Sequence, residues 1–167
     1  MNLKQMEYFV AAAEQLNFTR AAKKCFISQT AMTLQIQSLE EKIGVPLFVR
    51  DKHHVELTAA GKVYLNEARA ILVRAEEAAN RAAAVETADK LRNCTVKITA
   101  KGGANGKLFG AITSKEISEA LMSQYQLDVP KQKIVLDEPI KAYGTYEVKA
   151  KLGYEVSAKF SVSVSEE

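Results

Sequence analysis

The sequence predicts an α+β protein with two domains, the first rich in helices and the second a small α+β domain, connected by a long helix. Two observations lead to this fold class. Apolar residues up to about Ala88 recur mostly at helical spacing, whereas from Thr95 onward they mostly alternate, as in strands with one buried face. No linker rich in Pro, Gly or Ser separates the two patterns. We place the segments at residues 1–58, 59–92 and 93–167.

The composition is that of a globular chain. Apolar residues make up 47% and charged residues 26%, and 23 Lys+Arg against 20 Asp+Glu give a net charge of +3, too small to indicate nucleic-acid binding by itself. The apolar runs are too short to cross a bilayer and no signal segment follows Met1, so we expect a cytoplasmic protein without a membrane partner. Cys25 and Cys94 lack metal-ligand spacing and are expected to be reduced, buried thiols.

Three helices are predicted before residue 45. The first covers residues 3–16 and ends at a break over residues 17–19. Thr19 is the expected N-cap of a second, short helix that ends near Cys25. Ser28 is expected to cap a third helix, and Gly44 to end it. Two helices joined by so tight a connection form a helix-turn-helix.

The third helix has two different faces. At 100° per residue, four apolar residues fall on one stripe, which is expected in the core: Met32, Ile36, Leu39 and Ile43. The first turn then presents the side chains at the remaining positions outward: Gln29, Thr30, Thr33 and Leu34. Gln and Thr can exchange hydrogen bonds with base edges, and Leu can contact a thymine methyl group. A solvated helix face is the alternative interpretation.

Next along the chain, two short apolar segments flank a polar tip at residues 50–54, which predicts a two-stranded wing. Four motifs up to this region occur in order: Phe18-Thr19-Arg20-Ala21-Ala22, Ser28-Gln29-x-Ala31, the run from Leu39-Glu40 to Leu47-Phe48-x-Arg50, and Leu57-Thr58-x-Ala60-Gly61. Together they resemble the winged helix-turn-helix of LysR-type transcriptional regulators over roughly the first 60 residues. The resemblance implies double-stranded DNA as partner, with the third helix in the major groove and the wing in the adjacent minor groove.

The resemblance also implies roles for individual side chains. Bases would be read by Gln29, Thr30, Thr33 and Leu34, and the DNA backbone held by Arg20, Ser28 and Arg50. The wing would place Lys52, His53 and His54 at the minor groove. The family often has proline at position 30 and arginine at position 34, so we expect a different base preference and an intact fold. Two adjacent histidines without a Cys, Asp or Glu cluster do not predict a metal site, and no cofactor is expected.

A long helix capped by Thr58 is predicted to run to about Leu91, a length of roughly 50 Å. Its apolar residues recur at alternating spacings of four and three, which is typical of a coiled-coil seam: Tyr64, Ala68, Ile71, Ala75, Ala78 and Ala82. In the LysR-type family this segment pairs with its twin, so the resemblance implies a homodimer, with parallel and antiparallel pairing both open. The alternative is packing on the chain's own first domain, which suits residues 64–72 but not the helix beyond Ala75.

The last segment mixes strands with one helix. A strand over residues 95–101 leads into a glycine-rich loop, and Thr113-Ser114-Lys115-Glu116 is a capping box that begins a helix. A short strand follows at residues 134–136, and residues 146–152 and 156–164 alternate around a turn as a hairpin. The glycine loop lacks the residue order of a P-loop, and no Ser/His/acid or Cys/His set can be assembled, so we do not expect an enzyme.

A second resemblance covers residues 91–164. The runs Gly106-Lys107-Leu108-Phe109-Gly110, Glu138-Pro139-Ile140-Lys141 and Gly144-x-Tyr146-Glu147-Val148 are similar to the C-terminal domain of bacterial large-subunit ribosomal protein nine. The resemblance implies weak contact with ribosomal RNA at most, because the separate domain that provides that family's main anchor is absent here. The candidate residues for such a contact are Lys101, Lys107 and Lys115.

The two resemblances meet inside one helix. A LysR-type regulator normally continues into a two-lobed effector domain, which this chain lacks, so no small-molecule inducer is expected. The helical pattern is unbroken over residues 79–89, as when two helices are fused in phase, and we interpret the chain as an engineered chimera. A natural domain shuffle is the alternative. The predicted function is sequence-specific DNA binding, with a ribosomal RNA-binding or structural module, or a fusion scaffold for structure determination, as alternatives.

Overall fold

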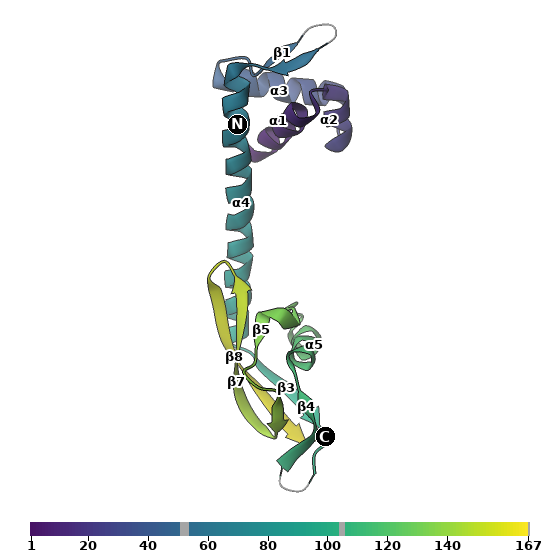
Figure 1. Cartoon of the computed structure of the whole chain (residues 1–167), viewed down its shortest axis with the longest axis vertical. Coiled ribbons are helices and arrows are strands. Elements are labelled where there is room, and N and C mark those ends of the chain that lie inside the picture. Colours follow the sequence, from purple (N-terminus) through teal and green to yellow (C-terminus); the bar gives the residue numbers. More distant parts are fainter. Residues whose placement is uncertain (51–53, 104–105, 167) are drawn as a thin grey trace. The chain divides into compact units, whose positions relative to one another are not determined.

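The computed structural model describes residues 1–50, 54–103 and 106–166. The chain forms two compact units, Met1–Glu76 and Glu77–Glu167 (Figure 1). The first unit is helical with a small wing and the second is an α+β unit, so the predicted fold class is confirmed. Each unit has a hydrophobic core of its own.

Three helices and two strands make up the first unit before the long helix α4 begins. In chain order they are α1 (Leu3–Gln15), α2 (Phe18–Lys24), α3 (Gln29–Ile43), β1 (Phe48–Arg50) and β2 (Val55–Leu57). The strands β1 and β2 pair antiparallel as the predicted wing. The turn between α2 and α3 includes Phe26 in the left-handed backbone region, with a φ of 55°.

The caps of these helices confirm one prediction and correct another. The Ser28 hydroxyl accepts a hydrogen bond from the Ala31 N–H at 3.1 Å, as expected for the N-cap of α3. The cap of α2 is Asn17, whose side chain accepts from the Arg20 N–H at 2.9 Å, so the assignment of Thr19 was wrong. The helix begins at Phe18, which places Thr19 inside the first turn, where it cannot act as a cap.

The core of the first unit joins the helix-turn-helix to the wing. Phe9 of α1 and Leu39 of α3 are fully buried, and β1 adds Phe48 to the same cluster. The Phe48 ring lies 5.3 Å from the Phe9 ring and 5.3 Å from the Phe18 ring, centroid to centroid. Tilted and edge-on aromatic contacts of this kind add to the free energy gained by burial. They hold the first wing strand against α1 and α2.

The helix α4 (Ala59–Arg92) is one continuous element of 34 residues. Thr58 precedes it, and the Thr58 hydroxyl accepts a hydrogen bond from the Gly61 N–H at 2.9 Å. Its early residues pack in the first core, where Ala68 is fully buried, and its last turns contribute Ala88 and Leu91 to the second core. None of the helices in the described ranges is long and apolar enough to span a membrane.

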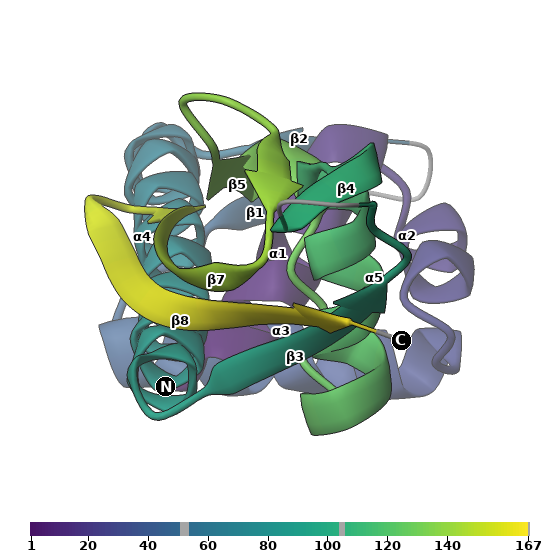
Figure 2. The same ribbon diagram turned by 90° about the horizontal axis from the view of Figure 1, so that it is seen from below.

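The second unit is built on a four-stranded sheet of order β3-β8-β7-β5. Figure 2 shows β8 between β3 and β7. The hairpin of β7 and β8 is the one predicted, and β3 pairs parallel to β8. A separate two-stranded sheet contains β4 and β6, of which β6 had no alternating pattern to reveal it. The strands are β3 (Thr95–Ala100), β4 (Lys107–Ile112), β5 (Ile134–Val135), β6 (Ile140–Ala142), β7 (Gly144–Gly153) and β8 (Val156–Glu166).

The helix α5 (Ser114–Tyr125) covers this sheet, and a short 3-10 turn, η2 (Lys131–Lys133), follows it. The predicted capping box is present: the Thr113 N–H donates to the Glu116 carboxylate at 2.9 Å, and the Thr113 hydroxyl accepts from the first turn. The Thr113 hydroxyl also donates to the Glu116 carboxylate, and this hydrogen bond, with smaller contributions from backbone N–H groups, holds the pKa of the Glu116 carboxyl below its usual value. Ile117 and Leu121 of α5 are fully buried against the sheet.

Candidate nucleic-acid interface

The first turn of α3 presents an open polar surface. Gln29 and Thr30 are exposed, Leu34 is 58% exposed and Thr33 is half-buried. In the described part of the chain, the side chains of these four residues make no hydrogen bond or ion pair with the protein. Their donors, acceptors and methyl groups are therefore free to meet a ligand, as base readout in a major groove requires.

The opposite face of α3 anchors the helix. Met32, Ile36 and Leu39 are completely buried, as their spacing predicted, whereas Ile43 at the end of the same stripe is half-buried. Full burial of three large side chains holds the helix firmly, since each contributes about 1.5–3 kcal/mol relative to exposure. The exposed turn is thus carried on a rigid element.

The three residues expected at the DNA backbone have different surroundings. Arg20 is exposed on α2 and forms no ion pair among the residues described. Ser28 uses its hydroxyl as the N-cap acceptor, while its hydroxyl hydrogen stays available as a donor. Arg50 is engaged: one guanidinium nitrogen lies 3.0 Å from the Glu40 carboxylate, and the group stacks 4.6 Å from the centroid of the Phe18 ring.

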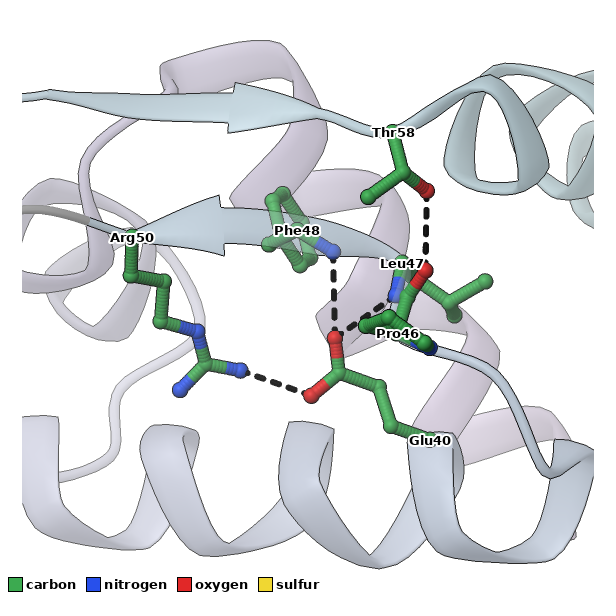
Figure 3. Close-up of polar contacts among 6 residues, drawn as sticks. All are labelled: Glu40, Pro46, Leu47, Phe48, Arg50 and Thr58. Atoms are coloured by element: carbon green, nitrogen blue, oxygen red, sulfur yellow. Dashed lines mark hydrogen bonds and ion pairs between the residues drawn. The ribbon is translucent and has the colours of Figure 1, made fainter.

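Glu40 links α3 to the wing, a role that the sequence did not reveal. One oxygen of the Glu40 carboxylate accepts hydrogen bonds from the backbone N–H groups of Leu47, at 2.8 Å, and Phe48, at 3.0 Å. Its other oxygen accepts from Arg50 (Figure 3). Glu40 lies next to the buried stripe in the helical pattern, but no local rule connects it to a strand seven residues later.

A second contact ties the same strand to the start of α4. The Thr58 hydroxyl donates to the Pro46 carbonyl oxygen at 2.8 Å, and the Thr58 N–H donates to the Leu47 carbonyl oxygen at 3.0 Å. The backbone is so close here that a Cβ on Gly61 would lie 2.1 Å from the Leu47 oxygen. Glycine at position 61 is therefore required by the close approach of α4 to the wing.

The predicted wing tip is described only in part. Lys52 and His53 lie outside the described residues, whereas His54 is described and exposed. Among the residues that the structure describes, no group of three or more His, Cys, Asp or Glu side chains is arranged to hold a metal ion.

The residues predicted for dimerisation fall into two sets. Tyr64 is half-buried and Ala68 fully buried in the core of the first unit, as the alternative interpretation of this stripe allowed. Ile71 is 38% exposed, Ala75 is partly exposed, and Ala78 and Ala82 are exposed. An open apolar stripe thus begins at Ile71 and continues along α4 to Val85, which is also exposed.

Two of the candidate RNA contacts of the second unit, Lys101 and Lys107, lie beside or in β4, and the third, Lys115, lies on α5. Lys107 begins this strand, and the backbone carbonyl of Lys101 accepts a hydrogen bond from the Phe109 N–H at 3.0 Å. The Phe109 side chain is 81% exposed, which the sequence pattern did not indicate. Lys115 lies on α5 with its ammonium group 3.9 Å from the Glu119 carboxylate.

The two cysteines are unpaired thiols. Cys94 is buried and donates a hydrogen bond to the Lys90 carbonyl oxygen at 3.1 Å, while Cys25 is half-buried. Burial raises the pKa of both thiols above its usual value. The expectation of a buried thiol is confirmed for Cys94, whereas Cys25 is only half-buried.

Two family models match separate parts of the chain. Residues 3–62 match the lysR family of bacterial regulatory helix-turn-helix proteins, and residues 82–166 match the C-terminal domain of ribosomal protein L9. One family is regulatory and the other ribosomal, and neither is enzymatic.

Curated relatives divide in the same way. The Hca operon transcriptional activator HcaR of Escherichia coli is 51% identical over 90 residues, which are 54% of this chain and 30% of that protein. The large ribosomal subunit protein bL9 of Carboxydothermus hydrogenoformans is 50% identical over 102 residues, which are 58% of this chain and 68% of that protein. The chain therefore spans less than a third of the activator. The segments that match the activator and the ribosomal protein add up to more than the length of this chain. The two matched segments therefore overlap in the middle of the chain, where α4 runs.

Solved structures resemble the N-terminal half. The DNA-binding domain of CbnR, solved as a complex with DNA, is 42% identical with a TM-score of 0.50, covering 52% of this chain and 99% of that one. The BenM DNA-binding domain bound to benA site 1 DNA is 32% identical with a TM-score of 0.50, covering 52% of this chain and 97% of that one. The two groups of relatives show that the chain is a fusion of two families.

Proposed function

We propose that this chain, which belongs to the LysR regulator family through residues 3–62 and to the ribosomal protein L9 family through residues 82–166, binds double-stranded DNA at specific sequences. The observation that carries the proposal is the open first turn of α3 on a fully buried apolar face. Relatives of this half were solved on DNA, which supports the same function.

In this proposal, α3 lies in the major groove with its N-terminal turn against the base edges. Gln29 donates and accepts on the edge of a base pair, and Thr30 and Thr33 add hydrogen bonds and methyl contacts. Leu34 offers only apolar contact, which suits a thymine methyl group. Arg20 holds a backbone phosphate and sets the register without carrying sequence information. Of the minor-groove residues proposed for the wing, only His54 lies in the described part of the chain.

Selection of bound sequences from a random duplex pool at physiological salt tests this function. We expect an enriched sequence motif and an affinity for it that falls steeply as salt rises. The paired substitutions Gln29→Ala and Thr33→Ala should weaken binding to the selected duplex about tenfold or more. Gln132→Ala is the matched control, because Gln132 is an exposed glutamine of the second unit. No enrichment, or equal loss in the control, would contradict the proposal.

We also propose that the chain binds DNA as a homodimer through the exposed stripe of α4. Ile71, Ala75, Ala78 and Ala82 are spaced as in a coiled-coil seam, and small side chains allow close helix approach. Tyr64 and Ala68 support the stripe from within their own unit.

Sedimentation equilibrium tests the dimer. Ala78→Glu combined with Ala82→Glu should shift the chain to monomer without unfolding it, because both positions are exposed. Ala70→Glu is the control, since Ala70 is exposed and lies about 100° around the helix from the seam. A wild-type chain that sediments as a monomer at micromolar concentration would contradict the proposal.

A second candidate function is RNA contact by the second unit, and the exposed Phe109 ring favours it. Aromatic rings stack on unpaired bases, and Lys101, Lys107 and Lys115 would supply the charge for phosphates. If this function holds, the chain co-sediments with large ribosomal subunits, and Phe109→Ala with Lys107→Ala reduces the bound fraction. Absence of co-sedimentation would exclude it.

We infer, finally, that the fusion is engineered. The overlap of the two matches in the middle of the chain and the unbroken helix α4 support a joint made in helical phase. In this case the second unit is a carrier, as in a scaffold for structure determination. A natural genome that encodes residues 1–88 and 89–167 as one reading frame would contradict this inference.

A further inference from the structure

Besides the core packing of Phe48, one carboxylate ties the wing to the recognition helix. Glu40 lies in the last turn of α3, and its side chain is only 16% exposed. Its two oxygens receive three hydrogen bonds, two from the backbone of β1 and its preceding residue and one from Arg50. Among the described residues, no other α3 side chain hydrogen-bonds to the wing. Glu40 is therefore the polar link between α3 and β1 (Figure 3).

Arg50 is bound on two sides within the protein. Its guanidinium pairs with Glu40 at 3.0 Å and covers the Phe18 ring at 4.6 Å, leaving the side chain 29% exposed. The Glu40 carboxylate neutralises its charge at short range. A phosphate contact by Arg50 would have to use its remaining N–H donors beside the Glu40 carboxylate, whose negative charge repels a phosphate, and this opposes DNA binding. Its position suits a contact within the protein better than a contact with DNA.

We propose that Glu40 and Arg50 form a latch that sets the position of the wing relative to the recognition helix, and that Arg50 acts through this latch instead of holding a phosphate. The inference rests on the proposed DNA binding. A helix in the major groove and a wing in the minor groove must be held in fixed register to bind together, and the latch supplies that register. Glu40 is thus a positioning residue.

The two possible roles of Arg50 predict opposite effects for Glu40→Gln. The glutamine keeps the size of the side chain but has one acceptor oxygen, so it cannot serve both the backbone N–H groups and Arg50. If the pair is a latch, the affinity for the selected duplex falls about tenfold, as for loss of a charged hydrogen bond. If Arg50 holds a phosphate, the substitution frees the guanidinium and the affinity stays equal or rises.

The salt dependence of binding gives a second, independent readout. Arg50→Met keeps an unbranched chain over the Phe18 ring but removes the charge. For a latch, the slope of log affinity against log salt stays that of the wild type although the affinity falls. For a phosphate contact, the slope becomes shallower by about 0.9. A shallower slope of this size would overturn the proposal.

Amide hydrogen exchange in the free protein separates the latch from DNA binding. We expect faster exchange of the Leu47 and Phe48 amides in Glu40→Ala, which removes both acceptor oxygens, with the rest of α3 unchanged. Glu41→Ala is the matched control, because Glu41 is the neighbouring carboxylate and is exposed. If the wild type binds no specific duplex but these amides respond, the proposed function fails and the latch stands. If they exchange at the wild-type rate in a folded Glu40→Ala chain, the latch is overturned.

Discussion

The helices α3 and α5 are built alike but use their polar faces differently. Each begins with a side-chain cap and buries a leucine completely, Leu39 in α3 and Leu121 in α5. In α5 the Gln124 amide donates to the Lys97 carbonyl oxygen at 2.6 Å and accepts from the Lys97 N–H at 3.0 Å. The first turn of α3, by contrast, makes no such bonds within the described part of the chain.

The difference separates a structural face from a recognition face. A polar side chain whose hydrogen bonds are satisfied by its own protein stabilises the fold and has nothing left for a partner. A polar face held on a rigid helix with its hydrogen bonds unsatisfied by protein is available to a ligand. Exposure alone does not make this distinction, because both Gln29 and Gln124 are exposed. Four experiments test the comparison between the two units, and they follow in order of decreasing expected effect.

The buried faces of the two helices should respond equally. Leu39→Ala and Leu121→Ala each remove a fully buried side chain, and we expect each to lower the free energy of unfolding of its own unit by about 3 kcal/mol. Urea denaturation followed by circular dichroism measures the loss. The exposed Leu34→Ala is the control and should change stability by less than about 0.5 kcal/mol. A large loss of stability in Leu34→Ala would mean that the Leu34 side chain is buried.

Substitution of a glycine in each unit tests how tightly the elements approach. Gly61→Ala places a methyl group against the Leu47 oxygen, and we expect a loss of about 2 kcal/mol because the wing must move. In an open helix the same change would be stabilising, so the sign alone is informative. Gly110→Ala has nothing within 4 Å and should be neutral. Thermal unfolding of both variants is the measurement, and a stabilised Gly61→Ala chain would refute the close approach.

The polar faces should respond in opposite ways. Gln124→Ala loses two hydrogen bonds to β3 and should destabilise the second unit by about 1 kcal/mol without affecting DNA binding. Gln29→Ala should leave stability unchanged and weaken DNA binding. Denaturation and duplex binding are measured on both variants. The comparison fails if Gln29→Ala destabilises the chain as much as Gln124→Ala does.

The smallest effect concerns Glu14 and depends on pH. Hydrogen bonds from Lys24 and Arg69 hold the pKa of the Glu14 carboxyl below its usual value of 4.5. A carboxyl with a lowered pKa in the folded state stabilises the fold above its unfolded pKa, and this contribution disappears as the pH falls through the folded value. Glu14→Gln should therefore be slightly less stable than the wild type near neutral pH. The two chains should converge in stability well below pH 4.5, as thermal unfolding can show.

Local patterns of the sequence were enough to predict most of the fold. The Ser28 cap, the Thr113 capping box and the β7–β8 hairpin were all predicted, because each depends on residues a few positions apart. The buried face of α3 followed from helical spacing alone. The N-cap of α2 was predicted at Thr19, two residues after its actual position at Asn17.

By itself, then, the sequence determined where most of the helices and strands lie, which face of α3 is buried, and which side chains of its first turn face outward. Only the tertiary structure decided that Arg50 pairs with Glu40, that Ala68 is used inside its own unit, and that Gly61 must lack a side chain. The physical reason is range. Caps and periodicity act between neighbours along the chain, whereas these contacts join the ends of different elements, whose approach depends on how the whole core packs.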